Sequence, residues 1–272
     1  MKMPAHVSKA GRAHRSEGTG AIHRALPEEV PVAIVFNGTT QAVMMATPAD
    51  LADFAHGFAL TEGIVTDLAE IEAFEIVEHA QGIEARFWLN DTRAEALAAR
   101  RRTMSGPVGC GLCGIDSLDQ ALRSVPHVAS DLCLTTQDVA RATDALRDHQ
   151  RLHDLTGATH AAGFLRPGSD MSLAREDVGR HNALDKLIGA LVRDGIDPGR
   201  GAAVMTSRLS VELVQKCAVA GIPVLIAVSA PTGAAVRLAD EVGITLAAFA
   251  RDGGFDLYSH PERINDEATH VA

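Results

Sequence analysis

Two cysteines three positions apart are the residues with the clearest potential for chemistry. They lie in the pentad Cys110-Gly111-Leu112-Cys113-Gly114, directly after Gly109. Two thiols at this spacing can bind a metal, cycle through a disulfide or carry a persulfide. The flanking glycines have no side chains, so they leave both sulfur atoms open to a partner and permit tight backbone turns.

The residues after the pentad predict that the thiols lie just before a helix. The run Asp116–Leu122 has the pattern of a capped helix start. The positive end of a helix dipole favours thiolate over thiol. A free cysteine with a pKa of about 8.5 is only a few per cent thiolate at neutral pH, whereas a pKa of about 7 would ionise roughly half of it. The sequence thus predicts easier ionisation in this loop.

Zinc binding and thioredoxin-type redox exchange are two alternatives that fit the pattern less well. A zinc deaminase carries His-x-Glu before Pro-Cys-x-x-Cys, and the glutamate acts on a metal-bound water. Here Gly109 precedes Cys110, and the His-x-Glu of this chain, His260-Pro261-Glu262, lies far downstream. A structural zinc site needs two more ligands, and no second CxxC exists. We therefore predict no metal ligands. A thioredoxin motif usually lies just after the first strand of a thioredoxin fold. The pattern of this chain does not predict that fold.

The other two cysteines, Cys133 and Cys217, lie in apolar stretches, and we expect both to be inert core residues. One CxxC with two isolated cysteines suits a reducing cytoplasm better than a secreted disulfide framework.

Composition bounds the kind of protein. At 272 residues, 46% hydrophobic and 22% charged, the chain can form one large domain or two small ones. The net charge of -10 argues against general nucleic-acid binding. No stretch reaches the roughly 18 apolar residues of a transmembrane helix. We expect a soluble cytoplasmic protein that binds neither nucleic acid nor membrane.

Residues 1–26 are interpreted as a disordered basic tail. They contain no apolar segment of the kind found in signal peptides. Their cations are Lys2, Lys9, Arg12, Arg15 and Arg24.

An N-terminal α+β portion is predicted over residues 27–130, ending in the CxxC loop. Asn37-Gly38 between two apolar runs predicts a hairpin. Thr47-Pro48 predicts the N-cap and first turn of a helix through about Leu60. Two strands at about 73–79 and 83–89 and a helix over 91–102 are expected to lead to the cysteine loop.

An α/β core is predicted over residues 131–272. Strands at 160–165 and 171–174 precede a helix over about 178–193 with an apolar stripe at helical spacing. Further strands at 202–205, 223–228 and 244–249 alternate with helices at 210–220 and 232–242. This alternation predicts a largely parallel sheet with helices on both faces.

Four polar loops follow the strands of this core. If the strands run parallel, the loops meet at the carboxyl edge of the sheet, where open α/β folds bind ligands. Hydroxyls, arginines and helix N-termini gathered there suit a phosphate or a nucleotide. Single Ser or Thr residues at helix starts are usually N-caps, so the prediction rests on their coincidence at one edge. The loops are Arg175-Glu176-Asp177, Thr206-Ser207-Arg208, Ser229-Ala230-Pro231-Thr232 and Arg251-Asp252-Gly253-Gly254.

The run Arg175–Lys186 is the densest polar segment of the chain. Part of it has a structural explanation, because Asp177 can cap the helix while Asp185 and Lys186 can face solvent.

The first turn of that helix is harder to explain structurally. Arg180 and His181 oppose the helix dipole, a cost that a bound anion or another partner would offset. We therefore predict a function for Arg180, His181 and Asn182. Lys186, one turn after Asn182, shares its helix face and joins this set.

With these residues in view, the chain resembles the FdhD/NarQ family from about Leu26 to Ile264. Two positions depart from the family pattern: Val211 stands where an aromatic residue is common, and Asp256 where asparagine is common. Asp256 adds negative charge near the predicted anion site. The motifs that carry the resemblance are Val32–Gly38, Thr47–Gly63, Cys110–Gly114, His160-Ala161-Ala162, Arg175–Lys186, Thr206-Ser207-Arg208 with Glu212, Ser229–Thr232, Thr245-Leu246, Phe249, Arg251, Phe255 and Tyr258–Arg263.

The resemblance implies a cytidine-deaminase-like three-layer core without the zinc chemistry, and a homodimer. It implies a sulfurtransferase-type carrier that accepts sulfur from a cysteine desulfurase. The sulfur passes to the molybdenum cofactor, bis-molybdopterin guanine dinucleotide, destined for formate dehydrogenase. A guanine nucleotide can bind in place of that cofactor. The persulfide cysteine of the family corresponds to Cys110, and Cys113 would assist or resolve.

The resemblance also points to cofactor contacts. Family members hold the guanine dinucleotide partly through the segment after the last core strand, which corresponds to Phe249, Ala250, Arg251, Asp252, Gly253 and Gly254. Together with the loop argument, the remaining expected contacts are Arg180, His181, Asn182, Lys186, Thr206, Ser207, Arg208, Ser229 and Thr232. The alternative function is a non-catalytic chaperone that binds and escorts the cofactor, with the CxxC as a docking loop.

Overall fold

The computed structural model describes residues 3–104 and 124–265. Cys110 and Cys113, which the sequence predicts to carry the chemistry, lie outside the described residues, as does the helix expected after them.

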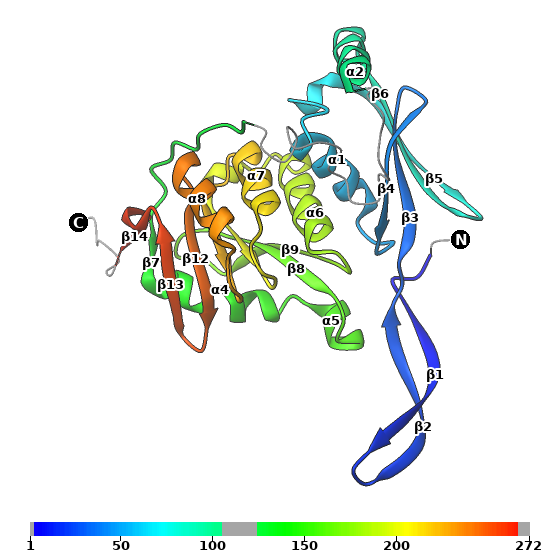
Figure 1. The fold of residues 1–272 in the computed structure, drawn as a ribbon, viewed down its shortest axis with the longest axis vertical. Coiled ribbons are helices and arrows are strands. Elements are labelled where there is room, and N and C mark those ends of the chain that lie inside the picture. Colours follow the sequence, from blue (N-terminus) through cyan, green and yellow to red (C-terminus); the bar gives the residue numbers. More distant parts are fainter. Residues whose placement is uncertain (1–2, 105–123, 266–272) are drawn as a thin grey trace.

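The N-terminal segment forms a two-stranded arm, which we define as residues 6–27. Strands β1 (His6–Arg15) and β2 (Gly18–Pro27) pair antiparallel over their full length. Figure 1 shows the arm extending away from the rest of the molecule. The prediction of a disordered tail is wrong here, because the arm is built from main-chain hydrogen bonds between strands.

The N-terminal sheet has four strands in the order β4-β3-β6-β5. Asn37 and Gly38 both have positive φ angles, 47° and 75°, as a two-residue hairpin turn requires, so the predicted hairpin is confirmed. β3 and β6 are parallel, and helix α1 (Leu51–Thr61) lies in the crossover between them. Helix α2 follows the sheet. The bounds are β3 (Val30–Phe36), β4 (Thr39–Ala46), β5 (Ile71–His79), β6 (Gly82–Leu89) and α2 (Asp91–Met104).

The core sheet has six strands in the order β13-β12-β11-β10-β8-β9. The pairs β10–β11 and β11–β12 are parallel and the other three pairs are antiparallel, so the expectation of a largely parallel sheet holds only for the central three strands. Short hairpin connections join β8 to β9 and β12 to β13, and such connections require antiparallel neighbours. The strands are β8 (His160–Leu165), β9 (Met171–Asp177), β10 (Ala202–Met205), β11 (Val224–Ala227), β12 (Thr245–Arg251) and β13 (Gly254–Ser259).

Helices cover both faces of this sheet and complete three layers (Figure 1). One core cluster lies under α6, α7 and α8, and another under α4. A likeness to cytidine deaminases remains a prediction. The helices are α4 (Thr136–Arg147), α5 (Arg151–Thr156), α6 (Arg180–Arg193), α7 (Val211–Ala220) and α8 (Gly233–Val242), and the short strands β7 (Leu134–Thr135) and β14 (Ile264–Asn265) pair beside them.

Helix α1 of the N-terminal portion packs directly against α6 of the core. A Cβ atom added to Gly57 would lie 1.8 Å from the carbonyl oxygen of Asp185, and one added to Gly189 would lie 1.8 Å from that of Asp53. The two backbones are therefore in contact where the glycines cross. The predicted portions 27–130 and 131–272 are thus joined by a close helix pair.

The start of α1 differs from the prediction. The helix begins at Leu51 with Asp50 as its N-cap, whereas Thr47 was expected to cap it. Thr47 instead accepts a hydrogen bond from the Val178 amide through its hydroxyl (3.1 Å) and donates its own amide to Asp177 (3.0 Å). The Thr47 hydroxyl therefore binds a residue far away in the sequence, whereas the local pattern predicted that it would cap α1.

Candidate functional site

The four predicted loops share one edge of the core sheet. The register pairs Asp177 with His160, and Met205 with both Ala162 and Ala227, so the ends of β9, β10 and β11 are level. β12 is parallel to β11 and reaches the same edge. We call this region, with the loops after these strands, the sheet edge.

Hydrogen bonds within the sheet edge occupy several of the predicted hydroxyls. Thr206 Oγ1 accepts from the Ala161 amide at 2.9 Å. Thr232 Oγ1 accepts from the Ala235 amide at 3.1 Å and caps α8. Ser207 is buried and donates its hydroxyl to the Arg208 carbonyl at 3.0 Å. These three hydroxyls fix the loops, while the exposed Arg208 side chain extends from them.

Phe249 adopts a strained backbone conformation at this edge. Its φ angle is +52°, in the left-handed region, and it lies within an irregularity of β12. Its amide meets the Ser229 carbonyl at 3.4 Å. A bulky aromatic residue at positive φ is an outlier that costs about 1–3 kcal/mol, and such strain clusters at ligand sites. This strain supports the predicted role of the segment.

The remainder of that segment is a hairpin rather than a loop. Asp252 and Gly253 have φ angles of 54° and 75° and form the two-residue turn between β12 and β13. Arg251 and Gly254 pair across it, and all four residues are exposed. Ala250 is buried, and its carbonyl accepts from Thr143 Oγ1 at 2.7 Å. The Asp-Gly dipeptide was the sequence signal for this missed hairpin.

A second polar group gathers where α6 and α7 begin. We define the helix-start cluster as Arg180, His181, Glu212 and Lys216. Gly179, the N-cap of α6, has no side chain to cap it, and the first turn contains no acidic residue. Electrostatic coupling links His181 to the other three residues, which shows that they lie close together.

Two nitrogen atoms of this cluster are buried without a partner. Among the residues that the structure describes, neither Arg180 Nε nor His181 Nε2 has a hydrogen-bond partner. Buried polar atoms are nearly always paired, so a ligand that pairs them would remove a cost to folding. Burial, helped by the charges of Arg180 and Lys216, lowers the pKa of His181 to about 4. At neutral pH its imidazole is uncharged and offers one donor and one acceptor.

Lys216 is a buried cation that the sequence argument did not select. Its ammonium group contacts Asp185 at 3.0 Å, Glu62 at 2.8 Å and Thr61 at 2.9 Å. Burial alone would lower the pKa of Lys216, but the Asp185 and Glu62 carboxylates raise it above its ordinary value. A single cation within the mainly apolar helix Val211–Ala220 was the available signal.

Asn182 and Lys186 face a different set of partners. Lys186 is fully buried, and its ammonium contacts Asp177 at 2.7 Å and the carbonyls of Thr47 and Glu176 at 3.1 and 3.2 Å. Asn182 donates to the Met45 carbonyl at 2.8 Å and to Asp177 at 2.9 Å. Three contacts use all three ammonium hydrogens. We call Asp177, Thr47, Asn182 and Lys186 the Asp177 cluster.

These contacts correct the prediction for this helix face. Asp185 and Lys186 were expected to face solvent, and both are buried. The partners of Asp185 come from α1 and α7. Those of Lys186 come from Thr47 and from the end of β9. Helical periodicity alone does not reveal these partners. The Asp177 cluster therefore joins the two portions of the chain and does not present its donors to the sheet edge.

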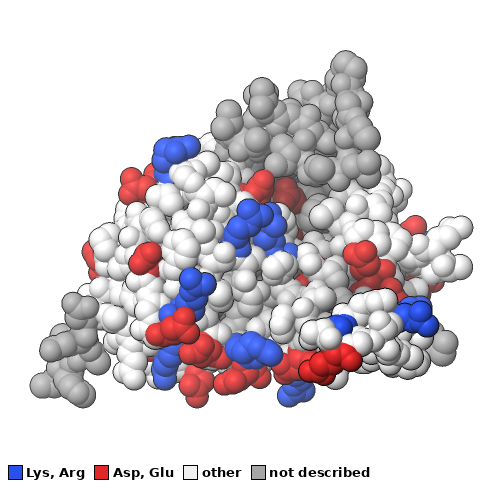
Figure 2. Space-filling model, turned by 60° about the horizontal axis from the view of Figure 1, so that its bottom comes forward, with Lys and Arg blue, Asp and Glu red and all other residues white. Residues whose placement is uncertain are grey.

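Charge on the surface is mixed. Figure 2 shows one face of the molecule. A group of Lys and Arg side chains lies near the middle of that face, and basic and acidic side chains are interspersed along its lower border. No helix in residues 3–104 and 124–265 is long and apolar enough to cross a membrane. Within the same ranges, no three His, Cys, Asp or Glu side chains are grouped to hold a metal ion.

The isolated cysteines differ from one another. Cys217 is fully buried, as expected, and burial raises its pKa to about 12. Cys133 is exposed, so its assignment to the core is wrong. Its neighbours Leu132 and Leu134 point inward, and the extended backbone turns Cys133 outward.

Known proteins resemble this chain in sequence and in fold. The FdhD/NarQ family matches residues 27–265. Sulfur carrier protein FdhD from Agrobacterium fabrum is 51% identical over 97% of this chain and 98% of its own length. The Brucella abortus protein of that name is 53% identical over 93% and 94%. A crystal structure assigned to a formate dehydrogenase accessory protein from Desulfotalea psychrophila superimposes with a TM-score of 0.77, at 25% identity, over 96% of this chain and all of that one. The chain belongs to the FdhD/NarQ family.

Proposed function

We propose that this protein is a cytoplasmic sulfur carrier that serves a formate dehydrogenase. It accepts sulfur from a cysteine desulfurase as a persulfide on Cys110 and passes it to the molybdenum cofactor, bis-molybdopterin guanine dinucleotide. The names of the relatives support the sulfur-carrier role. The observation that carries the cofactor-binding part is the pair of unpaired, buried nitrogen atoms on Arg180 and His181 at an uncapped helix start.

The loading step is an exchange between thiol groups. The Cys110 thiolate attacks the terminal sulfur of the desulfurase persulfide, the bond between the two desulfurase sulfurs breaks, and the desulfurase thiolate leaves. The product is a Cys110 persulfide, and no oxidant or reductant is consumed. Cys113 assists this exchange or resolves the persulfide.

The chain's own residues would hold the cofactor at the helix-start cluster and at the sheet edge. Arg180 and neutral His181 donate hydrogen bonds to phosphate oxygens, and the α6 N-terminus adds its dipole. The strained Phe249 and the exposed Arg208 and Arg251 contact the guanine nucleotide end. Five adjacent strand ends from β9 to β12 span about 19 Å. That length suits an extended dinucleotide better than a single phosphate.

Replacing the proposed carrier residue tests the function. In a strain that lacks the native protein, Cys110→Ala should abolish activation of formate dehydrogenase. Cys133→Ala is the matched control, because Cys133 is an exposed cysteine outside the CxxC motif and should be dispensable. Full activation by Cys110→Ala would overturn the persulfide role.

Mass spectrometry separates a carrier from an escort. After incubation with a cysteine desulfurase and cysteine, the Cys110 peptide should gain the mass of one sulfur atom. Binding of a guanine nucleotide without any gain of sulfur would instead favour the chaperone alternative.

A further inference from the structure

One member of the helix-start cluster, Glu212, carries a charge that opposes the binding of an anion. It lies in the first turn of α7, and electrostatic coupling links its carboxylate to Arg180 and His181. A carboxylate at this position stabilises a helix through the helix dipole, which gives Glu212 a structural role. It also places a negative charge beside the two residues that would donate hydrogen bonds to phosphate oxygens.

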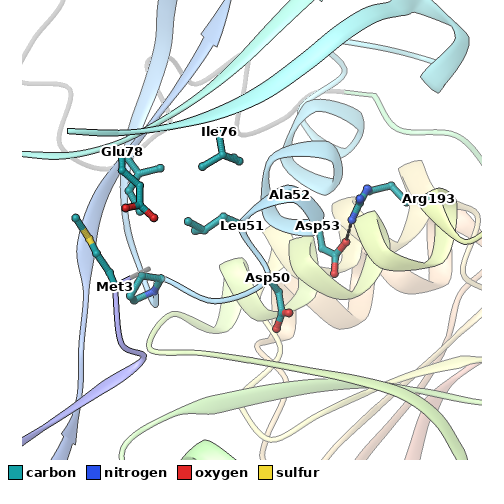
Figure 3. A pocket seen from close by; sticks show the side chains of 10 residues that line it. Met3, Asp50, Leu51, Ala52, Asp53, Ile76, Glu78 and Arg193 are labelled. Atoms are coloured by element: carbon teal, nitrogen blue, oxygen red, sulfur yellow. Dashed lines mark hydrogen bonds and ion pairs between the residues drawn. The ribbon is translucent and has the colours of Figure 1, made fainter. Parts of the chain in front are cut away.

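Asp53 provides a contrast, because neighbouring arginines engage both oxygens of its carboxylate. It lines a cavity between α1, the N-terminal sheet and the end of α6, where Figure 3 shows it joined to Arg193. Its other oxygen accepts from Arg175 Nε at 2.8 Å. Within residues 3–104 and 124–265, no ion pair joins Glu212 to Arg180, and Arg180 Nε has no hydrogen-bond partner. These two opposite charges therefore lie in one cluster without being paired.

The charge of Glu212 is not cancelled by the other cation of the cluster. Lys216 lies one turn further along α7, but two other carboxylates already hold its ammonium group at 3.0 and 2.8 Å. Burial alone would raise the pKa of Glu212, but hydrogen bonds at the start of α7 and the neighbouring His181 and Arg180 lower it below its ordinary value. At neutral pH, a ligand at this site therefore meets a carboxylate as well as the Arg180 guanidinium.

The limited tolerance of this site for negative charge distinguishes two kinds of phosphate. A phosphate at the end of a nucleotide carries a charge of about -1.5 to -2 at pH 7, because its second pKa is about 6. A phosphate that is esterified on both sides carries a single negative charge, as in the backbone of DNA. The additional charge would lie near Glu212, and in a partly buried site the repulsion between like charges is several times stronger than in water.

The proposed cofactor and a free nucleotide differ at this phosphate. Both contain the same guanine base and ribose, so contacts with those groups cannot distinguish the cofactor from free guanosine diphosphate. In the cofactor each phosphate is esterified on both sides, whereas guanosine diphosphate ends in a free phosphate. A residue that rejects the free nucleotide must therefore act at the end of its diphosphate.

We propose that Glu212 is a specificity-determining residue, which makes the helix-start cluster favour the singly charged phosphates of the cofactor over the doubly charged terminal phosphate of a free nucleotide. This specificity rests on the proposed function, because it concerns the same site. Arg180 and His181 attract either ligand, and Glu212 supplies the repulsion that distinguishes them.

Isothermal titration calorimetry at pH 8 with two matched ligands tests this role. The ligands are guanosine diphosphate and its methyl ester, in which a methyl group on the terminal phosphate removes one negative charge. The wild type should bind the methyl ester more tightly. Glu212→Gln should raise the affinity for guanosine diphosphate at least about tenfold and that for the methyl ester about threefold or less. Because both ligands are measured on the same variant, a partial loss of folded protein does not change their ratio.

Two control variants separate the local charge from other effects. Glu212→Asp keeps the carboxylate and should keep the preference for the methyl ester. Glu241→Gln removes an equal charge from an exposed position near the end of α8 and should leave both affinities unchanged. A wild type that prefers guanosine diphosphate, or a Glu212→Gln variant whose two affinities change equally, would overturn the role of Glu212 but not the proposed function. A wild type that binds neither ligand would overturn both.

Discussion

The Asp177 cluster and the helix-start cluster lie within two turns of each other on α6, yet their surroundings differ. In the Asp177 cluster, Lys186 and Asn182 direct their donors at protein acceptors. In the helix-start cluster, Arg180 and His181 each retain a buried nitrogen with no partner among the described residues. The same polar run thus contains one group that joins two parts of the chain and one suited to a ligand.

The difference comes from what packs opposite each turn. The Asp177 cluster meets the main chain of residues 45–47, which supplies carbonyl and amide groups. The helix-start cluster instead includes two side chains of α7, Glu212 and Lys216, and Lys216 pairs with Asp185. Buried polar groups left unpaired cost about 1–3 kcal/mol each, so a ligand at the helix-start cluster would also stabilise the protein.

Removing the cation of the Asp177 cluster should have the largest effect. Lys186→Met leaves the buried Asp177 carboxylate without its cation, so we expect a loss of about 3–5 kcal/mol in the free energy of unfolding. Urea unfolding measures this loss. Adding Asp177→Asn should recover part of it, because the uncompensated charge is gone. A loss below about 1 kcal/mol would contradict the assignment of this cluster as structural.

Disturbing the contact between α1 and α6, which supports both clusters, should have the next largest effect on stability. Gly57→Ala forces a methyl group against the Asp185 carbonyl and should cost about 1–3 kcal/mol or more. Gly233→Ala is the control, because a Cβ there meets only the far end of Arg237 at 3.6 Å. Equal stability of the two variants would show that α1 and α6 can separate without cost.

The helix-start cluster should make stability depend on pH through His181. Its folded pKa of about 4 lies below the unfolded value of about 6.5, so the unfolded chain binds more protons between these values. Its contribution is complete above pH 6.5 and is lost as pH falls toward 4. The wild type should therefore lose more stability between pH 7 and pH 5 than His181→Gln does.

His260 provides a control of opposite sign. A hydrogen bond to the Asp240 carbonyl, supported by Glu262, raises the pKa of His260. Its contribution is present below the unfolded pKa and is lost as pH rises through the folded pKa. His260→Gln should thus reduce stability more at pH 5 than at pH 8, as measured by urea unfolding. The same pH trend for both histidine variants would contradict the difference in their surroundings.

Removing the guanidinium group of Arg180 should change stability least. Arg180→Gln deletes a group that has a buried nitrogen without a partner, so the free energy of unfolding should stay within about 0.5 kcal/mol of the wild type. A loss of about 2 kcal/mol or more would place Arg180 with the structural residues.

The sequence predicted most where a local rule decides the structure. Asn37-Gly38 specifies a hairpin by its own conformational preference, and the polar character of Arg180 and His181 at a helix start is a local mismatch. Lys186 could not be separated from them, because its partners lie 9 to 139 residues away along the chain. The arm and β13 were missed because main-chain pairing formed them without the expected apolar pattern.

The most direct test of the account is the binding of guanosine diphosphate, measured by isothermal titration calorimetry on variants of the two clusters. Arg180→Gln with His181→Asn should weaken binding at least about tenfold, since charge-assisted hydrogen bonds contribute about 1.5–3 kcal/mol each. Asp177→Asn with Lys186→Met should lower stability but retain the wild-type affinity. Unchanged affinity in the first variant, or lost affinity in a folded second variant, would contradict the central claim that the helix-start cluster binds the ligand while the Asp177 cluster holds the fold.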